Sequence, residues 1–200
     1  MKNFTKLNLA VATLLTAGAL APVSAFAADN TVETNDTENV QKITGNTKIT
    51  FEGTDGALTL NQVPNFDFDN HKLSKSYDTF ESKNGGTVKV TDLTGSGKGY
   101  FVTANASDLT NNGATLQTKS FNFTAANSAV DEATKGQITG STDTPIFKTT
   151  TKIVEGNADA TGTLESGATS AKLTLSGNNV KAGTYTGTID YTLSNGPQQS

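Results

Sequence analysis

The sequence predicts an all-β fold, either a β-sandwich or a barrel-like antiparallel domain. Threonine is the most frequent of the 200 residues, and this β-branched residue favours strands. Glycine, with 19 residues, and asparagine recur between short apolar segments, where they favour turns. Many short strands separated by frequent turns are typical of sandwiches and barrels.

Alternation of apolar and polar residues places the individual strands. The apolar residues that mark them, in chain order, are Ile49 and Phe51, Leu58 and Leu60, Val88 and Val90, and Phe121 and Phe123 after Leu116. Further strands are expected at 99–104, 146–154 and 173–175. The clearest strand is 184–193, because Tyr185, Ile189, Tyr191 and Leu193 share one face and threonines occupy the other. One weakly helix-like stretch covers 125–134.

Residues 1–27 have the pattern of a secretory signal peptide, with a lysine-bearing start, an apolar run over 7–21 and the cleavage motif Ala25-Phe26-Ala27. The apolar run is too short and too interrupted for a membrane helix. Residues 28–47 are polar and poor in large apolar side chains, so we expect a flexible spacer there. Residues 48–200 form the expected folded domain.

The composition excludes several classes of function. Cysteine is absent, so there is no disulfide framework and no thiol nucleophile. All 15 basic residues are lysines, and the formal net charge of −4 becomes −6 once the signal peptide is removed. An acidic chain without arginine is a poor fit to nucleic acid. Because no second apolar stretch or covalent sorting motif follows, we expect a secreted, extracellular protein with no membrane span, which, if it stays on the cell, must bind there non-covalently.

No motif for catalysis, a cofactor or a metal is complete, so we expect a non-enzymatic protein without either ligand. Segment 95–99 lacks two residues of a phosphate-binding loop and is expected to be a glycine-rich hairpin. Asp67 and Asp69 lack the other ligands of a calcium loop, which favours a solvated turn. His71 is the single histidine, and no Gly-x-Ser-x-Gly elbow accompanies it. An intramolecular isopeptide crosslink stays open, because nothing picks out its partners.

Two pairs of residues at i and i+2 are the best candidates for a binding surface. Tyr100 and Val102 point the same way on either side of Phe101, as do Tyr191 and Leu193 around Thr192. Core packing is the competing interpretation, since aromatic and aliphatic residues usually face inward. Phe101 makes its strand apolar on both faces, so either both faces are buried or one carries an exposed contact patch.

Four stretches taken together resemble the WxL domain of surface proteins from low-GC Gram-positive bacteria. They cover 58–68 (LTLNQVPNFDF), 90–104 (ending GYFVTA), 108–111 and 182–193 (ending YTL), in the order and spacing of the family. Tyr100 and Tyr191 stand where the family has its two signature tryptophans. Val102 replaces the first leucine, whereas Leu193 keeps the second.

The resemblance implies non-covalent attachment to peptidoglycan or an associated wall polymer through the two motifs, Tyr100, Phe101, Val102 and Tyr191, Thr192, Leu193. It also implies assembly with other WxL-type proteins and with a membrane-anchored WxL-interacting protein. Two alternatives compete with this interpretation. One is an adhesin or structural subunit of a multi-protein surface complex, and the other is a glycan-cleaving enzyme, which would need two facing carboxylates in a groove.

Overall fold

The computed structural model describes residues 32–35, 40–43, 49–50, 57–83 and 85–196. The chain divides into two compact units, Met1–Thr50 and Phe51–Ser200. In the first unit, β1 (Val32–Asn35) pairs antiparallel with β2 (Val40–Ile43), within the segment predicted to be a spacer. The predicted signal peptide lies outside the described residues, and the domain boundaries stay predictions.

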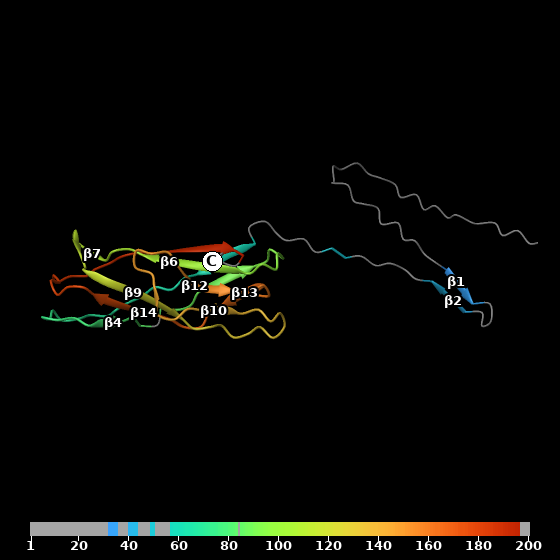
Figure 1. Cartoon of the computed structure of the whole chain (residues 1–200), viewed down its shortest axis with the longest axis horizontal. Helices are drawn as coiled ribbons and strands as arrows, with labels where there is room; N and C mark the ends of the chain where they lie inside the picture. Colours follow the sequence, from blue (N-terminus) through green and yellow to red (C-terminus); the bar gives the residue numbers. More distant parts are fainter. Residues whose placement is uncertain (1–31, 36–39, 44–48, 51–56, 84, 197–200) are drawn as a thin grey trace, which may run out of the picture. The chain divides into compact units, whose positions relative to one another are not determined.

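The described residues of the second unit form strands and no helix (Figure 1). One sheet has the order β10 (Ile138–Gly140), β12 (Thr151–Gly156), β6 (Tyr100–Ala106) and β15 (Ile189–Asn195). A second has the order β11 (Thr144–Pro145), β9 (Thr118–Ala125), β14 (Thr169–Leu175) and β4 (Thr79–Glu81). A third has the order β13 (Gly162–Glu165), β5 (Lys89–Asp92) and β3 (Leu58–Gln62), and a small ribbon joins β7 (Thr110–Asn111) to β8 (Ala114–Thr115).

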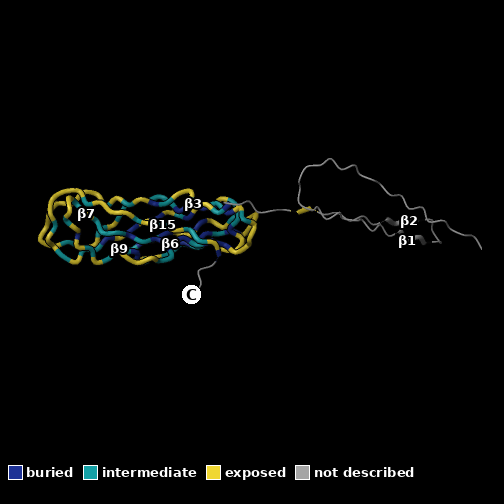
Figure 2. The backbone as a smooth tube through the Cα atoms, turned by 90° about the horizontal axis from the view of Figure 1, so that it is seen from above, coloured by how far each residue is buried: buried dark blue, intermediate teal, exposed yellow. Residues whose placement is uncertain are grey.

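The hydrophobic core lies between the sheets, and its buried segments run through the interior of the second unit (Figure 2). Strand β9 follows the expected period of two, since Phe121 and Phe123 are buried while Asn122 and Thr124 between and after them are only partly covered. Every pairing between the strands is antiparallel. The predicted all-β, sandwich-like antiparallel class is therefore confirmed.

The last strand is shorter than predicted, because it begins at Ile189 rather than at 184. Residue Thr186 instead makes an isolated bridge to Thr110, with two backbone N–H···O distances of 2.8 and 3.0 Å. Gly187 lies so close to β7 that an added Cβ would come within 2.7 Å of the Asp108 carbonyl oxygen. The alternating pattern over 184–188 therefore belongs to a loop held against another part of the domain.

Two local predictions were wrong, and a third falls partly outside the described residues. The helix-like stretch 125–134 contains no helix: Ala125 ends β9, and 132–134 form a turn, in which the Asp131 carboxylate accepts a hydrogen bond of 2.8 Å from the Ala133 N–H. Segment 95–99 connects β5 to β6, which belong to different sheets, so it is a crossing loop rather than a hairpin. Of the strand predicted over 48–52, Ile49 and Thr50 have no strand structure and Phe51 lies outside the described residues.

Candidate functional site

The fold brings the two predicted motifs together on neighbouring strands. In the antiparallel pairing of β6 with β15, Val102 lies opposite Leu193, and Tyr191 lies opposite Ala104. Directly opposed residues of a sheet share one face, so Tyr100, Val102, Tyr191 and Leu193 all project from the same side. The two motifs, which are far apart in the sequence, thus lie on adjacent strands of one sheet.

Tyr100 and Val102 lie in the core, and neither has any exposed surface. The Tyr100 ring covers Gly156, its partner on β12, where a Cβ would come within 2.5 Å of the ring carbon Cζ. The Tyr100 hydroxyl is buried and makes no hydrogen bond within the described part of the chain. For this residue the structure selects core packing over an exposed contact.

Tyr191 and Leu193 are only half-buried, unlike their counterparts on β6. The Tyr191 hydroxyl donates a hydrogen bond of 3.0 Å to the carbonyl oxygen of Pro64. This bond ties β15 to the segment that follows β3. The second motif therefore lies at the boundary between the core and an accessible space.

Phe101 and Thr192 project from the opposite, outer face of the same sheet. Phe101 is half-buried, with Glu155 of β12 opposite it on one side and Ser194 of β15 on the other. Thr192 is exposed. The six predicted residues are thus divided between the core, the edge of an accessible space and the outer surface.

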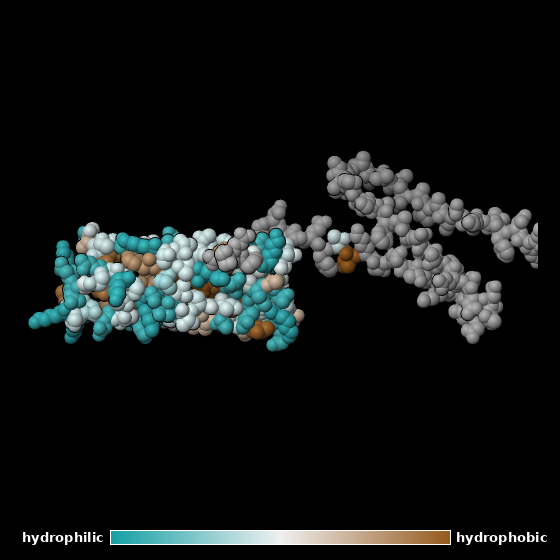
Figure 3. Space-filling model, in the orientation of Figure 1, coloured by the Kyte–Doolittle hydropathy of each residue, from teal (hydrophilic) through white to brown (hydrophobic). Residues whose placement is uncertain are grey.

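The accessible space beside Tyr191 is a cavity of about 750 Å³. Two connecting segments, 63–78 between β3 and β4 and 176–188 between β14 and β15, supply most of its lining. Loops longer than about 12 residues without strands of their own are uncommon and usually functional. In Figure 3, hydrophobic residues show between hydrophilic ones at the end of the unit that carries β7.

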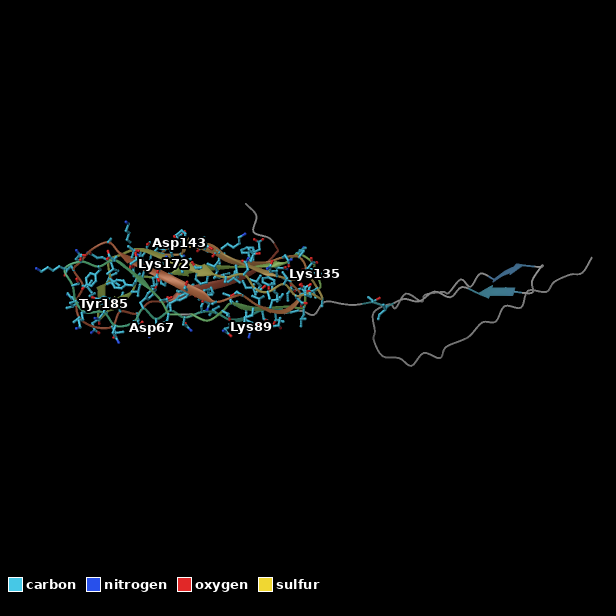
Figure 4. The ribbon with its side chains drawn as sticks, turned by 90° about the horizontal axis from the view of Figure 1, so that it is seen from below. Asp67, Lys89, Lys135, Asp143, Lys172 and Tyr185 are labelled. Atoms are coloured by element: carbon cyan, nitrogen blue, oxygen red, sulfur yellow. The ribbon has the colours of Figure 1, made fainter. Side chains whose placement is uncertain are left out.

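Sequence reasoning missed this cavity. Segment 63–78 was noted only for its motifs, and residues 184–188 of the second segment were predicted to belong to the last strand. The aromatic residues that line the cavity are Phe66, Phe68, His71, Tyr77, Phe80, Phe121, Tyr185 and Tyr191. Figure 4 shows Tyr185 and Asp67 toward one end of the unit, and Lys135 at the other.

The polar residues considered for chemistry take part in loop structure. Asp69 forms an ion pair with Lys83, and its backbone N–H donates to the Asp67 carboxylate at 2.9 Å. The His71 ring packs on Phe80 with centroids 4.4 Å apart, and its Nε2 atom lies 2.5 Å from the Phe68 carbonyl oxygen. Among the described residues, no three acidic or histidine side chains gather as metal ligands would.

Ionisation of the two motif tyrosines should make stability depend on alkaline pH. Burial raises the pKa of Tyr191 and, with the nearby charge of Asp92, that of Tyr100. An unfolded tyrosine ionises near pH 10, so above that pH the unfolded chain loses protons that the folded domain keeps. We expect the free energy of unfolding to fall above about pH 10, by up to about 1.4 kcal/mol per pH unit for each tyrosine.

Urea unfolding at about pH 8 and about pH 11 measures this dependence, since those values lie on either side of the ionisation of a free tyrosine. The Tyr100→Phe, Tyr191→Phe double variant should lose less stability between the two conditions than the wild type. Equal losses in both proteins would show that other groups cause the alkaline destabilisation.

No helix in the described ranges is long and apolar enough to cross a membrane.

No curated protein and no solved structure matched the chain. A sequence model of a protein family, described as WxL domain surface cell wall-binding, matches residues 29–197. That range contains both β6 and β15, and the family's description names binding to the cell wall. The chain therefore belongs to the WxL domain family of surface cell wall-binding proteins.

Proposed function

We propose that this protein is secreted and attaches non-covalently to the peptidoglycan of a Gram-positive cell wall, with the β6–β15 pair as its binding element. The observation that carries the proposal is the meeting of the two family motifs on paired strands, with Val102 opposite Leu193. Its partners on the surface would be other WxL-type proteins and a membrane-anchored WxL-interacting protein. It would act without catalysis.

The burial of each motif residue indicates whether it would stabilise the fold or contact the wall. Tyr100 and Val102 are fully buried, so they would hold β6 in place beside β15 rather than touch the wall. The other four residues, Phe101, Tyr191, Thr192 and Leu193, keep exposed surface and are the motif residues that a wall polymer could reach. Aromatic side chains in accessible positions often supply most of the energy of a contact.

The charge of the chain favours contact by shape and hydrogen bonding over long-range attraction. Its formal net charge is −4, or −6 once the predicted signal peptide is removed, and anionic wall polymers would repel such a chain weakly. Charge attraction of exposed groups weakens in salt, whereas burial of aromatic surface does not. Wall binding should therefore persist when the salt concentration is raised.

Sedimentation with washed Gram-positive walls tests the proposal. The purified protein should move from the supernatant to the wall pellet, and Tyr191→Ala or Phe101→Ala should weaken binding by roughly tenfold or more. Phe147→Ala is the matched control, since Phe147 is another half-buried aromatic residue of the core that lies outside the motifs. Each variant is first shown to be folded by circular dichroism.

A wild-type protein that stays in the supernatant would overturn the proposal and favour the structural-subunit alternative. If the wild type sediments while both motif variants bind equally well, wall attachment stands and its assignment to the β6–β15 pair is wrong. Loss of binding in the Phe147→Ala control as well would also overturn the assignment to the β6–β15 pair. It would show that removing a half-buried aromatic ring outside the motifs weakens binding equally.

A further inference from the structure

One wall of the cavity beside Tyr191 is a set of aromatic rings from segment 63–80. The Phe68 ring meets Phe121 edge-on with centroids 5.5 Å apart, and the Tyr77 ring lies 6.0 Å from Phe80. Such contacts fix the rings in position at low entropic cost. All five of these rings are half-buried or exposed, so they are available to a bound molecule; they are Phe66, Phe68, His71, Tyr77 and Phe80.

A second part of the lining comes from segment 176–188 and the start of β15. It presents Tyr185, Ile189 and Tyr191, all half-buried and all lining the cavity. The Tyr185 hydroxyl accepts a hydrogen bond of 3.2 Å from the Lys181 N–H, which anchors the ring within its own loop. A molecule entering the cavity would therefore meet aromatic rings from both segments.

Several backbone groups of segment 176–188 that line the cavity are already paired. Both the N–H and the C=O of Thr186 bond to Thr110, and the Thr188 N–H donates to the Ser107 hydroxyl at 2.9 Å. A peptide adding as an extra strand needs free backbone groups, so this segment offers it little. Recognition here depends on side chains.

Short polar side chains at the rim have no partner in the parts of the chain that the structure describes. They are the amides of Asn65 and Asn70 and the hydroxyls of Thr184 and Thr186, all on exposed residues that line the cavity. The charged lining is nearly balanced, because Asp69 is paired with Lys83, while Asp67 and Lys181 have opposite charges and form no ion pair. An uncharged ligand with many hydroxyl or amide groups suits such a rim.

We propose that this cavity binds the glycan strand of the wall, with uncharged amino-sugar rings packed on Tyr185 and on the aromatic rings of segment 63–80. A pyranose ring has an apolar C–H face that packs on an aromatic ring and a polar edge that the free amides and hydroxyls can bond. Pockets of about 300–1,000 Å³ with mostly apolar walls and a few placed polar groups are typical of small-ligand sites. The inference rests on the proposed wall attachment. It adds the ligand, a glycan strand, and the binding site, the cavity beside Tyr191.

Tyrosine fluorescence gives a direct measurement, because the chain has no tryptophan and only four tyrosines. Three of them, Tyr77, Tyr185 and Tyr191, line the cavity. Titration with the tetrasaccharide of N-acetylglucosamine should change the emission of the wild type in a saturable way. Tyr185→Ala should weaken binding by about tenfold or more, whereas Phe147→Ala, at an aromatic residue away from the cavity, should not.

Two further titrations and the wall pellet separate the outcomes. Saturable binding of inorganic polyphosphate, a stand-in for anionic wall polymers, without binding of the tetrasaccharide would overturn the inference, as would a response to a neutral hydrophobic peptide alone. If the wild type and Tyr185→Ala sediment equally with walls and neither binds the tetrasaccharide, the glycan site is wrong and wall attachment stands. If the wild type does not sediment, the proposed function itself fails.

Discussion

Tyr100→Ala is expected to lower the free energy of unfolding by about 3–5 kcal/mol, the cost of removing a fully buried aromatic ring. The side chain has no exposed surface and lies among the core residues contributed by β6 and β12. Its loss would also uncover Gly156, which has no side chain to fill the space. Urea or thermal unfolding measures the change, and domains of this size tolerate few losses so large.

Tyr100→Phe is the matched control for this variant. The Tyr100 hydroxyl is buried and has no hydrogen-bond partner in the described part of the chain, so its removal gives up no bond and relieves a desolvated polar group. We expect Tyr100→Phe to be neutral or to raise stability slightly, and to bind walls like the wild type. A large loss of stability in Tyr100→Phe would mean that the hydroxyl has a partner, such as a buried water, and that the ring alone is not what β6 requires.

Phenylalanine variants of Tyr100 and Tyr191 also distinguish a residue that only packs in the core from one that makes a hydrogen bond. The motif pattern alone does not distinguish them. Tyr191→Phe loses the bond to the Pro64 carbonyl and should cost about 1 kcal/mol, while keeping the ring beside the cavity. Tyr100→Phe loses no such bond. Two tyrosines that stand at equivalent motif positions are therefore expected to respond differently to the same substitution.

Local pattern was enough to place the longer strands, such as β6, β9, β14 and β15, and the shared face of each motif, whereas the short strands β4, β7, β8, β10, β11 and β13 were not predicted. The alternation around Phe101 and around Thr192 follows from the period of two of a strand, which depends only on neighbours in the sequence. It could not say which face is inward, because that depends on the sheet opposite. Tyr100 is buried since Gly156 of β12 makes room for its ring, and no rule links these two positions in the sequence.

The cavity could not be predicted for a similar reason. Its walls are connecting segments whose course is fixed by contacts with distant parts of the chain. The Asn65 N–H donates to the Gly85 carbonyl at 3.1 Å, and the Thr186 backbone pairs with Thr110. The stretch 184–188 has the alternation of a strand, and only that bridge shows why it lines a cavity instead of extending β15.

Gly156→Ala is expected to destabilise the domain by about 3 kcal/mol, at the upper end of the usual cost of overpacking. A Cβ at this position would lie 2.5 Å from Cζ of Tyr100 and 2.7 Å from both Cε atoms. Because the ring is fully buried, it has no free space into which to move. Relief would require β6 and β12 to separate, which would break the ladder between them.

The double variant Gly156→Ala, Tyr100→Leu identifies the cause. Leucine has no ring over Gly156, so the added methyl group meets less opposition, and the loss in the double variant should be smaller than the sum of the two single losses by about 1–3 kcal/mol. Strict additivity would contradict the packing of the ring on the glycine. The same substitutions also bear on wall binding. Among the described strands of its sheet, β6 is the one that β15 pairs with, so a displaced β6 would displace the second motif as well. If the fit of Tyr100 on Gly156 fixes β6, then Gly156→Ala should also weaken wall binding at temperatures where the variant is still folded, although residue 156 lies on neither motif.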